Sequence, residues 1–474
     1  MNNRNWFEVS REGLKQLQAG KPKDFVVREL IQNAWDENVS VCHLNSSYEN
    51  GMAHIEVEDD SPEGFRDITH AFTIFAPTYK RKDPEKRGRF NIGEKQILAI
   101  CEEAVIATTK GTVVFNAEGR HHQDTKLDKG SIITLELKMT HDEYEAMLSS
   151  ISLYLPPEGI DFRVNGSVIP YRKPYSTAEA TLLTEVQKDE KVTKLYRKVR
   201  IDVHEVDSDK GYLYEMGLPV CEIDCPYNAD IQQKIPMSID RNRVSASYLQ
   251  KVFAAVLNET HQDIDPEGAS NKWVRDAMAD KNVSEKAVQS VVKQRYGGKV
   301  VVANPGDKVS IDDALSKGYR VVYGSELSSE EWKNIRKADA IPASSALFPS
   351  SIATDAEVVE ENTDMNKVSE LTKKIAKRCL GINVNVAFSS WEGKVAAQYG
   401  NRTLMFNVKS LGKRFFTPAL SARVIDLILH ELAHEEGMHT EVSYHQCLSK
   451  MAGQLIMIAM DDPEFFASWK NNGN

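Results

Sequence analysis

The stretch FVVRELIQNAWDEN, residues 25–38, decides the fold of the first part of this 474-residue chain. Read as a helix, it places Glu29, Asn33 and Asp36 at i, i+4 and i+7, so three polar side chains share one face. The neighbouring face is apolar and can pack on a sheet. A carboxylate one turn from an amide suits a site where a base polarises water beside a metal ion with oxygen ligands. A helix whose charges only face solvent has the same pattern, so the following segments must decide.

Three segments with glycine turns follow this helix in order. Residues 54–60, HIEVEDD, alternate apolar and polar residues like a half-buried strand and lead into the turn DDSPEGF. Gly88 and Gly93 lie in a basic loop, KRGRFNIGEK, that runs into an apolar helix, and such a loop lets backbone N–H groups approach an anion. Gly130 and Ser131 begin the strand SIITLEL. One glycine loop alone is weak evidence, but the order and spacing of these segments indicate a phosphate-binding site.

In this order the segments resemble the ATP-binding domain shared by Hsp90, DNA gyrase B, MutL and histidine kinases, the GHKL family. ELIQNAWDE is similar to the N box, DDSPEG to the adenine-reading loop, and GRFNIGEK to the ATP lid. Gly130 and Ser131 resemble the last glycine motif. The resemblance covers roughly residues 1–140 and implies ATP and Mg²⁺ as cofactors.

The resemblance also implies a role for each matching residue. Glu29 would activate the attacking water, Asn33 would help to hold Mg²⁺ with the phosphates, and Asp36 would lie near the nucleotide. Asp60 would accept a hydrogen bond from the adenine amino group. Asp59 is the alternative, because a one-residue shift turns a strand side chain to the opposite face. The other expected ATP and Mg²⁺ contacts are Gly64, Gly88, Asn91, Gly93, Lys95 and Ser131.

Two parts of the motif depart from the family pattern. Pro62 stands where the second loop usually has glycine. Glu94 and Lys95 stand in the lid where a further glycine is often found. These differences affect the expected geometry of the lid more than nucleotide binding itself.

Length and composition set broader limits. A chain of 474 residues suggests two to four domains, and 41% hydrophobic with 27% charged residues is ordinary for a globular protein. The net charge of −10 argues against a globally basic nucleic-acid binder. No apolar run approaches the ~20 residues that cross a bilayer, and the N-terminus lacks the apolar region of a signal peptide. We therefore expect a cytoplasmic protein without a membrane partner.

Residues 141–261 read as a second α/β domain. A helix is expected at residues 141–153, and Asn165-Gly166 predicts a hairpin turn. LYRKVRIDVHEV and GYLYEMGLPV alternate like strands, and SASYLQKVFAAVLNETH reads as a closing helix.

The loop DIQQKIPMSIDRNR in this domain offers a further phosphate contact. In relatives of the gyrase and MutL type, a second domain extends a lysine to the γ-phosphate, and Gln232 and Lys234 resemble that loop. Lys234 is therefore a candidate catalytic residue. Arg241 and Arg243 are alternatives, because a guanidinium group also suits phosphate. A lysine that only blocks aggregation at a strand edge would give the same pattern.

Residues 262–350 read as a polar helical connector followed by a small β-α-β-α unit. Ser284 or Asn282 is expected to cap the second half of the connector. Buried strands are expected at residues 300–302 and 320–323. The acidic, Ser/Thr-rich segment at residues 348–364 reads as a linker.

A second chemical site is indicated by DLILHELAHEEGMHTEVSYH, residues 426–445. His430 and His434 are one helical turn apart in HELAH and can point at a single Zn²⁺. Glu431 can take a proton from the metal-bound water. Four of the chain's twelve histidines fall within this short segment, which makes a chance cluster a poor explanation.

A catalytic zinc ion needs a third protein ligand and keeps its fourth position for water. His439 is the first choice, because Gly437 lets the chain turn before it, and Glu441 and His445 are the alternatives. The segment resembles zincin metallopeptidases in its HExxH and in the strand-like LMFNV before the helix, although HELAHEEGMH is one residue shorter than HExxHxxGxxH. The same motif is also found where two buried histidines only form hydrogen bonds within the fold, or where a bound metal ion has only a structural role. Glu431 favours catalysis, because a structural site has no use for that carboxylate.

The sequence therefore predicts an α+β multi-domain protein. A Bergerat-type α/β sandwich for ATP is expected at residues 1–140 and a transducer-like α/β domain at 141–261. A helical connector with a small α/β unit would follow at 262–350, and a mostly helical zincin-like domain at 351–474. The layout weakly resembles phage-encoded Hsp90-like proteins of the lysis-control class.

The expected function is an ATPase whose ATP cycle gates a zinc-dependent peptidase that acts on a protein or peptide, with an ATP-dependent homodimer as a further partner. The alternative is a non-proteolytic, ATP-driven chaperone-like or clamp-like switch whose zincin-like domain binds a partner protein. A DNA clamp like MutL is a third reading, and the acidic charge and the lack of a nuclease motif weigh against it.

Overall fold

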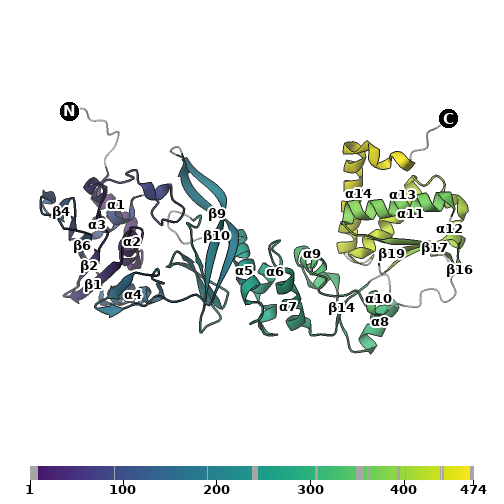
Figure 1. Ribbon diagram of the computed structural model, residues 1–474, viewed down its shortest axis with the longest axis horizontal. Coiled ribbons are helices and arrows are strands. Elements are labelled where there is room, and N and C mark those ends of the chain that lie inside the picture. The colour runs from purple at the N-terminus through teal and green to yellow at the C-terminus, as the bar shows by residue number, and fades with distance from the viewer. Residues whose placement is uncertain are drawn as a thin grey trace. The chain divides into compact units, whose positions relative to one another are not determined.

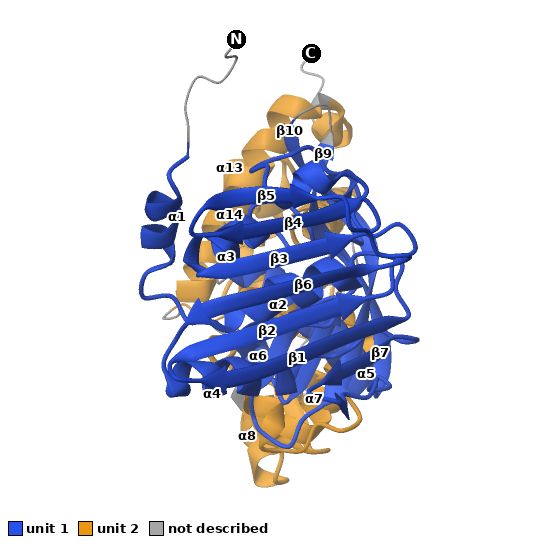
Figure 2. Ribbon diagram, turned by 90° about the vertical axis from the view of Figure 1, so that its left-hand side faces the viewer, with its two compact units in different colours: residues 1–260, 272–277 blue, residues 261–271, 278–474 orange. Residues whose placement is uncertain are grey.

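The computed structural model describes residues 9–89, 91–188, 191–237, 244–304, 308–348, 357–359, 362–391, 395–400, 402–437, 439 and 442–469. The chain divides into two compact units, residues 1–260 with 272–277 and residues 261–271 with 278–474 (Figures 1 and 2). Each unit combines helices and sheets, as the predicted α+β multi-domain organisation requires. Within the described residues, no helix is both long and apolar enough to span a membrane.

An eight-stranded sheet forms the first layer of the first unit, with strand order β5-β4-β3-β6-β2-β1-β7-β8, and Figure 2 shows most of it face-on. All neighbouring strands are antiparallel except β1 and β7. The strands are β1 (Val41–Glu49), β2 (Met52–Asp59), β3 (Glu103–Thr108), β4 (Gly111–Asn116), β5 (Gly119–Gln123), β6 (Ser131–Lys138), β7 (Asp161–Val164) and β8 (Ser167–Val168). The sheet therefore continues past residue 140, where the sequence placed the end of the first domain.

The turn between β7 and β8 follows the sequence prediction. Asn165 and Gly166 both have positive φ, 48° and 79°, which is the backbone of a two-residue hairpin turn. Asparagine and glycine adopt this conformation at low cost, so the dipeptide sets the hairpin locally.

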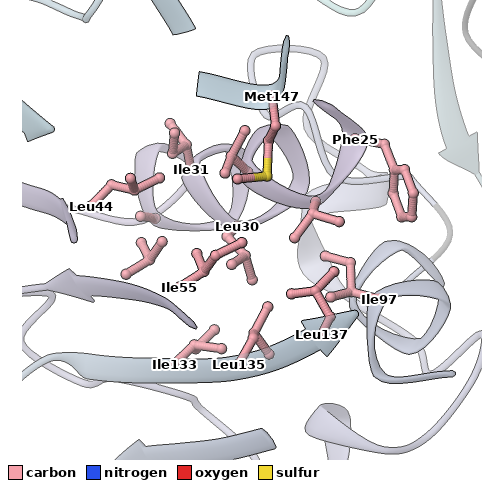
Figure 3. Close-up of a cluster of buried hydrophobic side chains, with 14 of the residues drawn as sticks. Phe25, Leu30, Ile31, Leu44, Ile55, Ile97, Ile133, Leu135, Leu137 and Met147 are labelled. Atoms are coloured by element: carbon pink, nitrogen blue, oxygen red, sulfur yellow. The ribbon is translucent and has the colours of Figure 1, made fainter. Parts of the chain in front are cut away.

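Helix α2 (Asp24–Trp35) lies on one face of this sheet, with α3 (Gly93–Ile100) and α4 (His141–Ser150) beside it and α1 (Arg11–Gln18) against α3. Figure 3 shows Leu30 and Ile31 of α2 above Ile55, Ile133 and Leu135 of the strands. Burial of one such side chain contributes roughly 1.5–3 kcal/mol. The apolar face of the helix is therefore fixed by the sheet, and its polar face is left for the pocket described below. The helix begins at Asp24, and its N-cap residue, Lys23, makes no side-chain cap hydrogen bond.

A five-stranded sheet completes the first unit, with strand order β12-β11-β13-β10-β9. Its strands are β9 (Ser176–Lys188), β10 (Lys191–Glu205), β11 (Gly211–Glu215), β12 (Leu218–Ile223) and β13 (Tyr227–Ile231). Helix α5 (Ala246–Thr260) packs against β9 and β13. Trp273 of α6 (Lys272–Met278) contacts the rings of Tyr227 and Phe253. We call this layer the second sheet.

The second unit begins with a helical region and two short parallel strands. Ser284 caps α7 (Glu285–Tyr296) by accepting a hydrogen bond from the Ala287 N–H, which confirms the first of the two predicted caps. Strands β14 (Val300–Val302) and β15 (Arg320–Val322) pair in parallel near the predicted positions. The adjoining helices are α8 (Lys308–Ser316), α9 (Ser329–Lys337) and α10 (Ser344–Leu347).

A four-stranded sheet with order β16-β17-β19-β18 carries the last part of the chain. Its strands are β16 (Glu357–Val358), β17 (Asn385–Ser390), β18 (Ala397–Gly400) and β19 (Thr403–Asn407), and its helices are α11 (Thr363–Ile375), α12 (Val408–Leu411), α13 (Ala422–Leu432) and α14 (Val442–Asp461). Three aromatic rings lie in its core: Phe388 stacks on Phe406, and Phe416 packs edge-on against both. Because β16 pairs with β17, part of the segment expected to be a linker is a strand.

Candidate functional sites

A pocket of about 840 Å³ in the first unit brings together the polar face of α2, the end of β2, the start of β6 and residues 77–94. Its volume lies in the range of small-molecule sites in proteins. We call residues 80–93 the lid, and its described residues that line the pocket are Lys80, Gly88, Arg89, Asn91, Ile92 and Gly93. The expected residues that line the pocket are Glu29, Asn33, Gly64, Gly88, Asn91, Gly93 and Ser131. The expected residues outside its lining are Asp36, Asp60, Lys95 and Lys234.

Glu29 lies where the lid meets helix α2. The carboxyl group is buried, and a Cβ placed on Gly93 would lie only 2.0 Å from its Oε2 atom. A side chain at position 93 would thus displace the carboxylate. Glycine allows the N-terminus of α3, with its free backbone N–H groups, to approach this end of the pocket.

Asn33 lies one turn further along α2 and connects to the start of α3. Its Nδ2 atom donates to Glu94 Oε1 over 2.8 Å, so the amide oxygen is the atom left to act as a metal ligand. Lys95 donates to Glu94 Oε2 over 3.1 Å and to Asn91 Oδ1 over 3.3 Å. Lys95 does not line the pocket, and its expected nucleotide contact stays a prediction. Its ammonium group is buried outside the pocket, where these two acceptors satisfy it.

Asp36 holds the lid to α2. The side chain is fully buried, and it accepts hydrogen bonds from the backbone N–H groups of Arg87 at 2.9 Å and Gly88 at 2.7 Å. Burial alone would raise the pKa of Asp36, but the charges of Lys80 and Arg87 and these N–H groups hold it below its ordinary value. The carboxylate is thus bound by the lid and does not line the pocket, and the expectation that Asp36 lies near the nucleotide stays a prediction.

The two aspartates at the end of β2 face different partners. Asp60 accepts from the Ser40 N–H, the Ser40 hydroxyl and the Val41 N–H at 2.7–2.9 Å, which fixes the chain before β1. Asp59 lines the pocket, accepts from the Ser61 N–H at 2.9 Å and receives a hydrogen bond from the Ser131 hydroxyl. Of the two candidates for the adenine contact, the alternative Asp59 lines the pocket and the first choice Asp60 does not, because consecutive side chains of a strand point to opposite faces.

Close backbone contacts around Asp59 require glycine. A Cβ on Gly130 would lie 2.0 Å from the Asp59 carbonyl oxygen. One on Gly64, whose φ is +55°, would lie 2.5 Å from the Gly130 carbonyl oxygen. These two glycines bring three loops together at the floor of the pocket, as the motif spacing indicated.

Lys234 reaches the lid instead of the pocket. Its side chain is 1% exposed, and its ammonium group donates to the carbonyl oxygens of Asp83, at 2.8 Å, and Lys80. Burial lowers the pKa of Lys234 to about 8. Both backbone acceptors belong to the lid, and Lys234 does not line the pocket in this conformation, so its contact with the γ-phosphate stays a prediction. The alternatives Arg241 and Arg243 lie outside the described residues.

Arg89 is a pocket residue that the sequence reasoning did not single out. It is 9% exposed, lines the pocket, and forms a paired contact with Glu215 of β11, with Nη1 to Oε1 at 2.7 Å. The basic run KRGR contains it, but the run gives no sign of a partner 126 residues away.

Three imidazole rings converge in the second unit. Ligand atoms of His430, His434 and His439 all lie within 4.8 Å of one another, and the Nε2 atoms of His430 and His439 are 2.9 Å apart. His434 Nδ1 lies 3.2 Å from the Gly437 carbonyl oxygen, and a proton on Nδ1 leaves Nε2 as a ligand. Three imidazole nitrogens are a donor set that suits Zn²⁺.

The Tyr444 hydroxyl orients the first of these rings. Its oxygen is 2.9 Å from His430 Nδ1 and donates to the His430 carbonyl oxygen at 3.3 Å. It can therefore accept an N–H from Nδ1, which leaves His430 Nε2 free to bind a metal ion. Of the alternative third ligands, His445 contacts the His439 carbonyl oxygen at 2.8 Å, and Glu441 lies outside the described residues.

A pocket of about 480 Å³ contains the three histidines. Glu431 also lines it, and burial raises the pKa of that carboxyl group to about 7. One wall consists of β18, the edge strand of its sheet. The site thus combines a metal-binding donor set, a carboxyl group that titrates near neutrality and an open strand edge.

No family model matches the chain, and a search of curated proteins finds no match. Among solved structures, the ATPase region of Saccharomyces cerevisiae topoisomerase II is similar, with 14% identity over 46% of this chain and 75% of that chain and a TM-score of 0.32. A structure of the same region bound to ICRF-187 (dexrazoxane) has 12% identity over 51% of this chain and 85% of that chain, with a TM-score of 0.33. Likeness at this level carries no functional argument, so the proposals below depend on the geometry of the two pockets.

We expect the intact chain to bind one zinc ion through the three histidines. His434→Ala should lose the bound zinc, because two imidazoles and water form a much weaker site. His445→Ala is the matched control and should retain it. Zinc per chain after dialysis, measured by mass spectrometry, tests this. Equal loss in both variants would show that the third ligand is wrongly assigned.

Proposed function

We propose that the first unit binds ATP with Mg²⁺ and hydrolyses it. The observation that carries this proposal is one pocket with a carboxylate and hydroxyl pair at its floor, a glycine lid, and a buried glutamate beside an asparagine. The floor pair, Asp59 and Ser131, suits adenine, because the carboxylate can accept from the exocyclic amino group while the Ser131 hydroxyl, which donates to Asp59, holds that carboxylate in place.

The opposite end of the pocket suits the phosphates. Backbone N–H groups at the start of α3 can bind phosphate oxygens, and the helix dipole favours negative charge there. Asn33 would hold Mg²⁺ through its amide oxygen, and bound Mg²⁺ neutralises charge on the phosphates. Glu29 would accept a proton from the water that attacks the γ-phosphorus, while the bond to the leaving ADP oxygen breaks.

Glu29→Ala should bind Mg²⁺ and ATP with nearly unchanged affinity and lose hydrolysis by about 10²–10⁴-fold, the usual contribution of a general base. Glu63→Ala, an exposed carboxylate of the loop after β2, is the control and should leave both unchanged. Calorimetry gives the affinity and phosphate release gives the rate. Hydrolysis that survives in Glu29→Ala would remove the glutamate from this role.

Asp59→Asn should weaken ADP binding by about 10–100-fold, because the adenine amino group would lose a charged acceptor. Asp60→Asn changes the neighbouring residue in the same way and should leave the affinity within about twofold, since that carboxylate does not line the pocket. Calorimetric titration with ADP separates the two. The reverse order of effects would restore Asp60 as the adenine reader.

We further propose that the second unit is a zinc-dependent peptidase. Three histidines fit a zinc ion, and bound zinc supplies Lewis acidity to water and to the scissile carbonyl. Glu431 would take the proton of the attacking water and pass it to the leaving amine. The edge strand β18 offers unpaired backbone groups along which an extended peptide can lie. Because both sites belong to one chain, we also propose that the ATP cycle gates cleavage and is accompanied by homodimer formation.

Glu431→Gln should keep its zinc and lose cleavage of casein, whereas wild-type protein should cleave casein at a rate that changes when ATP is added. Glu464→Gln, a carboxylate at the end of the chain, is the control for non-specific effects. Absence of cleavage in zinc-loaded wild-type protein would favour the second candidate, a non-proteolytic switch in which this pocket binds a partner.

A further inference from the structure

The lid is attached to the second sheet by several long-range contacts. Lys234 donates to two lid carbonyl oxygens, and Arg87 donates to the Met216 carbonyl oxygen. Arg197 of β10 pairs with Glu85, and Arg89 pairs with Glu215. Among the side chains that make these contacts in the described part of the chain, Arg89 alone also lines the pocket. It is therefore the group placed to contact a nucleotide and the second sheet at once.

The guanidinium group of Arg89 has a donor to spare. Nη1 and Nη2 contact the two carboxylate oxygens of Glu215, and Nη2 also donates to the Ile235 carbonyl oxygen at 2.8 Å. The Nε–H is buried and has no acceptor among the residues that the structure describes. A buried donor without a partner is costly, and a guanidinium fork binds phosphate oxygens well. The Nε–H of Arg89 is therefore a donor for which a bound ligand can provide the acceptor.

We propose that Arg89 binds the terminal phosphate of the nucleotide and that this contact competes with Glu215, so that the second sheet distinguishes a triphosphate from a diphosphate. The proposal rests on the nucleotide binding proposed above. The position of Arg89 supports a contact with the terminal phosphate, because Arg89 lies in the lid between Gly88 and the residues that approach Glu29. The phosphate that reaches furthest towards Glu29 is the one to be hydrolysed.

The competition has a defined consequence in the second sheet. Glu215 ends β11 and also accepts the Ile235 N–H at 2.7 Å. Lys234, the neighbouring residue, donates its own backbone N–H to the Pro84 carbonyl oxygen at 2.7 Å. When a phosphate shares the charge of Arg89, the ion pair between Arg89 and Glu215 weakens. The loop with the backbone N–H groups of Lys234 and Ile235 is then bound less tightly to the lid. A triphosphate therefore increases hydrogen exchange at Lys234 and Ile235, and a diphosphate does not.

The test uses the full chain with Mg²⁺ and compares ADP with a non-hydrolysable ATP analogue. Arg89→Gln should weaken analogue binding by about tenfold or more, because it removes a charge-assisted contact, and leave ADP binding within about twofold. Arg197→Gln is the matched control, since it removes another arginine contact between the lid and the second sheet from outside the pocket. It should change neither affinity. Hydrogen exchange at Lys234 and Ile235 should rise with the analogue in wild type and not in Arg89→Gln.

Arg89→Gln leaves Glu215 buried without its cation, which can prevent folding. The double variant Arg89→Gln/Glu215→Gln removes both charges and should show the same selective loss of analogue binding. Equal weakening of ADP and analogue in either folded variant would overturn the proposal and make Arg89 a structural residue. Wild-type protein that binds neither nucleotide would instead contradict the proposed function itself.

Discussion

The contacts of the buried Asp36 carboxylate are the interaction on which the pocket of the first unit depends. The carboxylate accepts hydrogen bonds from two backbone N–H groups and from the guanidinium group of Arg87, so it fixes residues 87–88 of the lid against helix α2. A carboxylate with no exposure is stable only when its acceptor sites are filled, and hydrogen bonds to a charged acceptor are roughly twice as strong as neutral ones. The helix itself cannot shift, because its apolar face is packed on the sheet (Figure 3). The position of the lid follows from these two constraints.

Glycine residues allow the close approaches around the pocket where a Cβ atom would collide with a neighbouring segment. Gly93 allows the N-terminus of α3 to come against Glu29, and Gly130 and Gly64 allow two loops to close over the end of β2. Each close approach leaves no room for a Cβ atom. The glycines thus determine which backbone N–H groups face the pocket, and the charged side chains around them determine what ligand those groups suit.

The two pockets follow different chemical designs. In the first pocket, the carboxylate of Glu29 lies beside the amide of Asn33 and close to the backbone N–H groups at the start of α3. This arrangement suits phosphoryl transfer, in which positioning and charge matter most. The second sets three imidazoles around one point, with Tyr444 and the Gly437 carbonyl oxygen to orient two of the rings. Such partners fix the tautomer and therefore the atom that can bind metal. A carboxyl group beside the triad adds proton transfer to a site that could otherwise be structural.

Local signals in the sequence were sufficient to predict α2, the Asn165-Gly166 hairpin, the Ser284 cap and the helix that carries HExxH, because each depends on residues close together in the chain. They also predicted the lid glycines and Glu29 as members of one pocket. The choice between Asp59 and Asp60 depended on the strand register and on Ser40 and Val41, which are distant in sequence. The roles of Asp36, Lys95, Lys234 and Arg89 were decided by tertiary structure alone, since a buried charge takes the partners that the fold brings to it, and no local pattern specifies them.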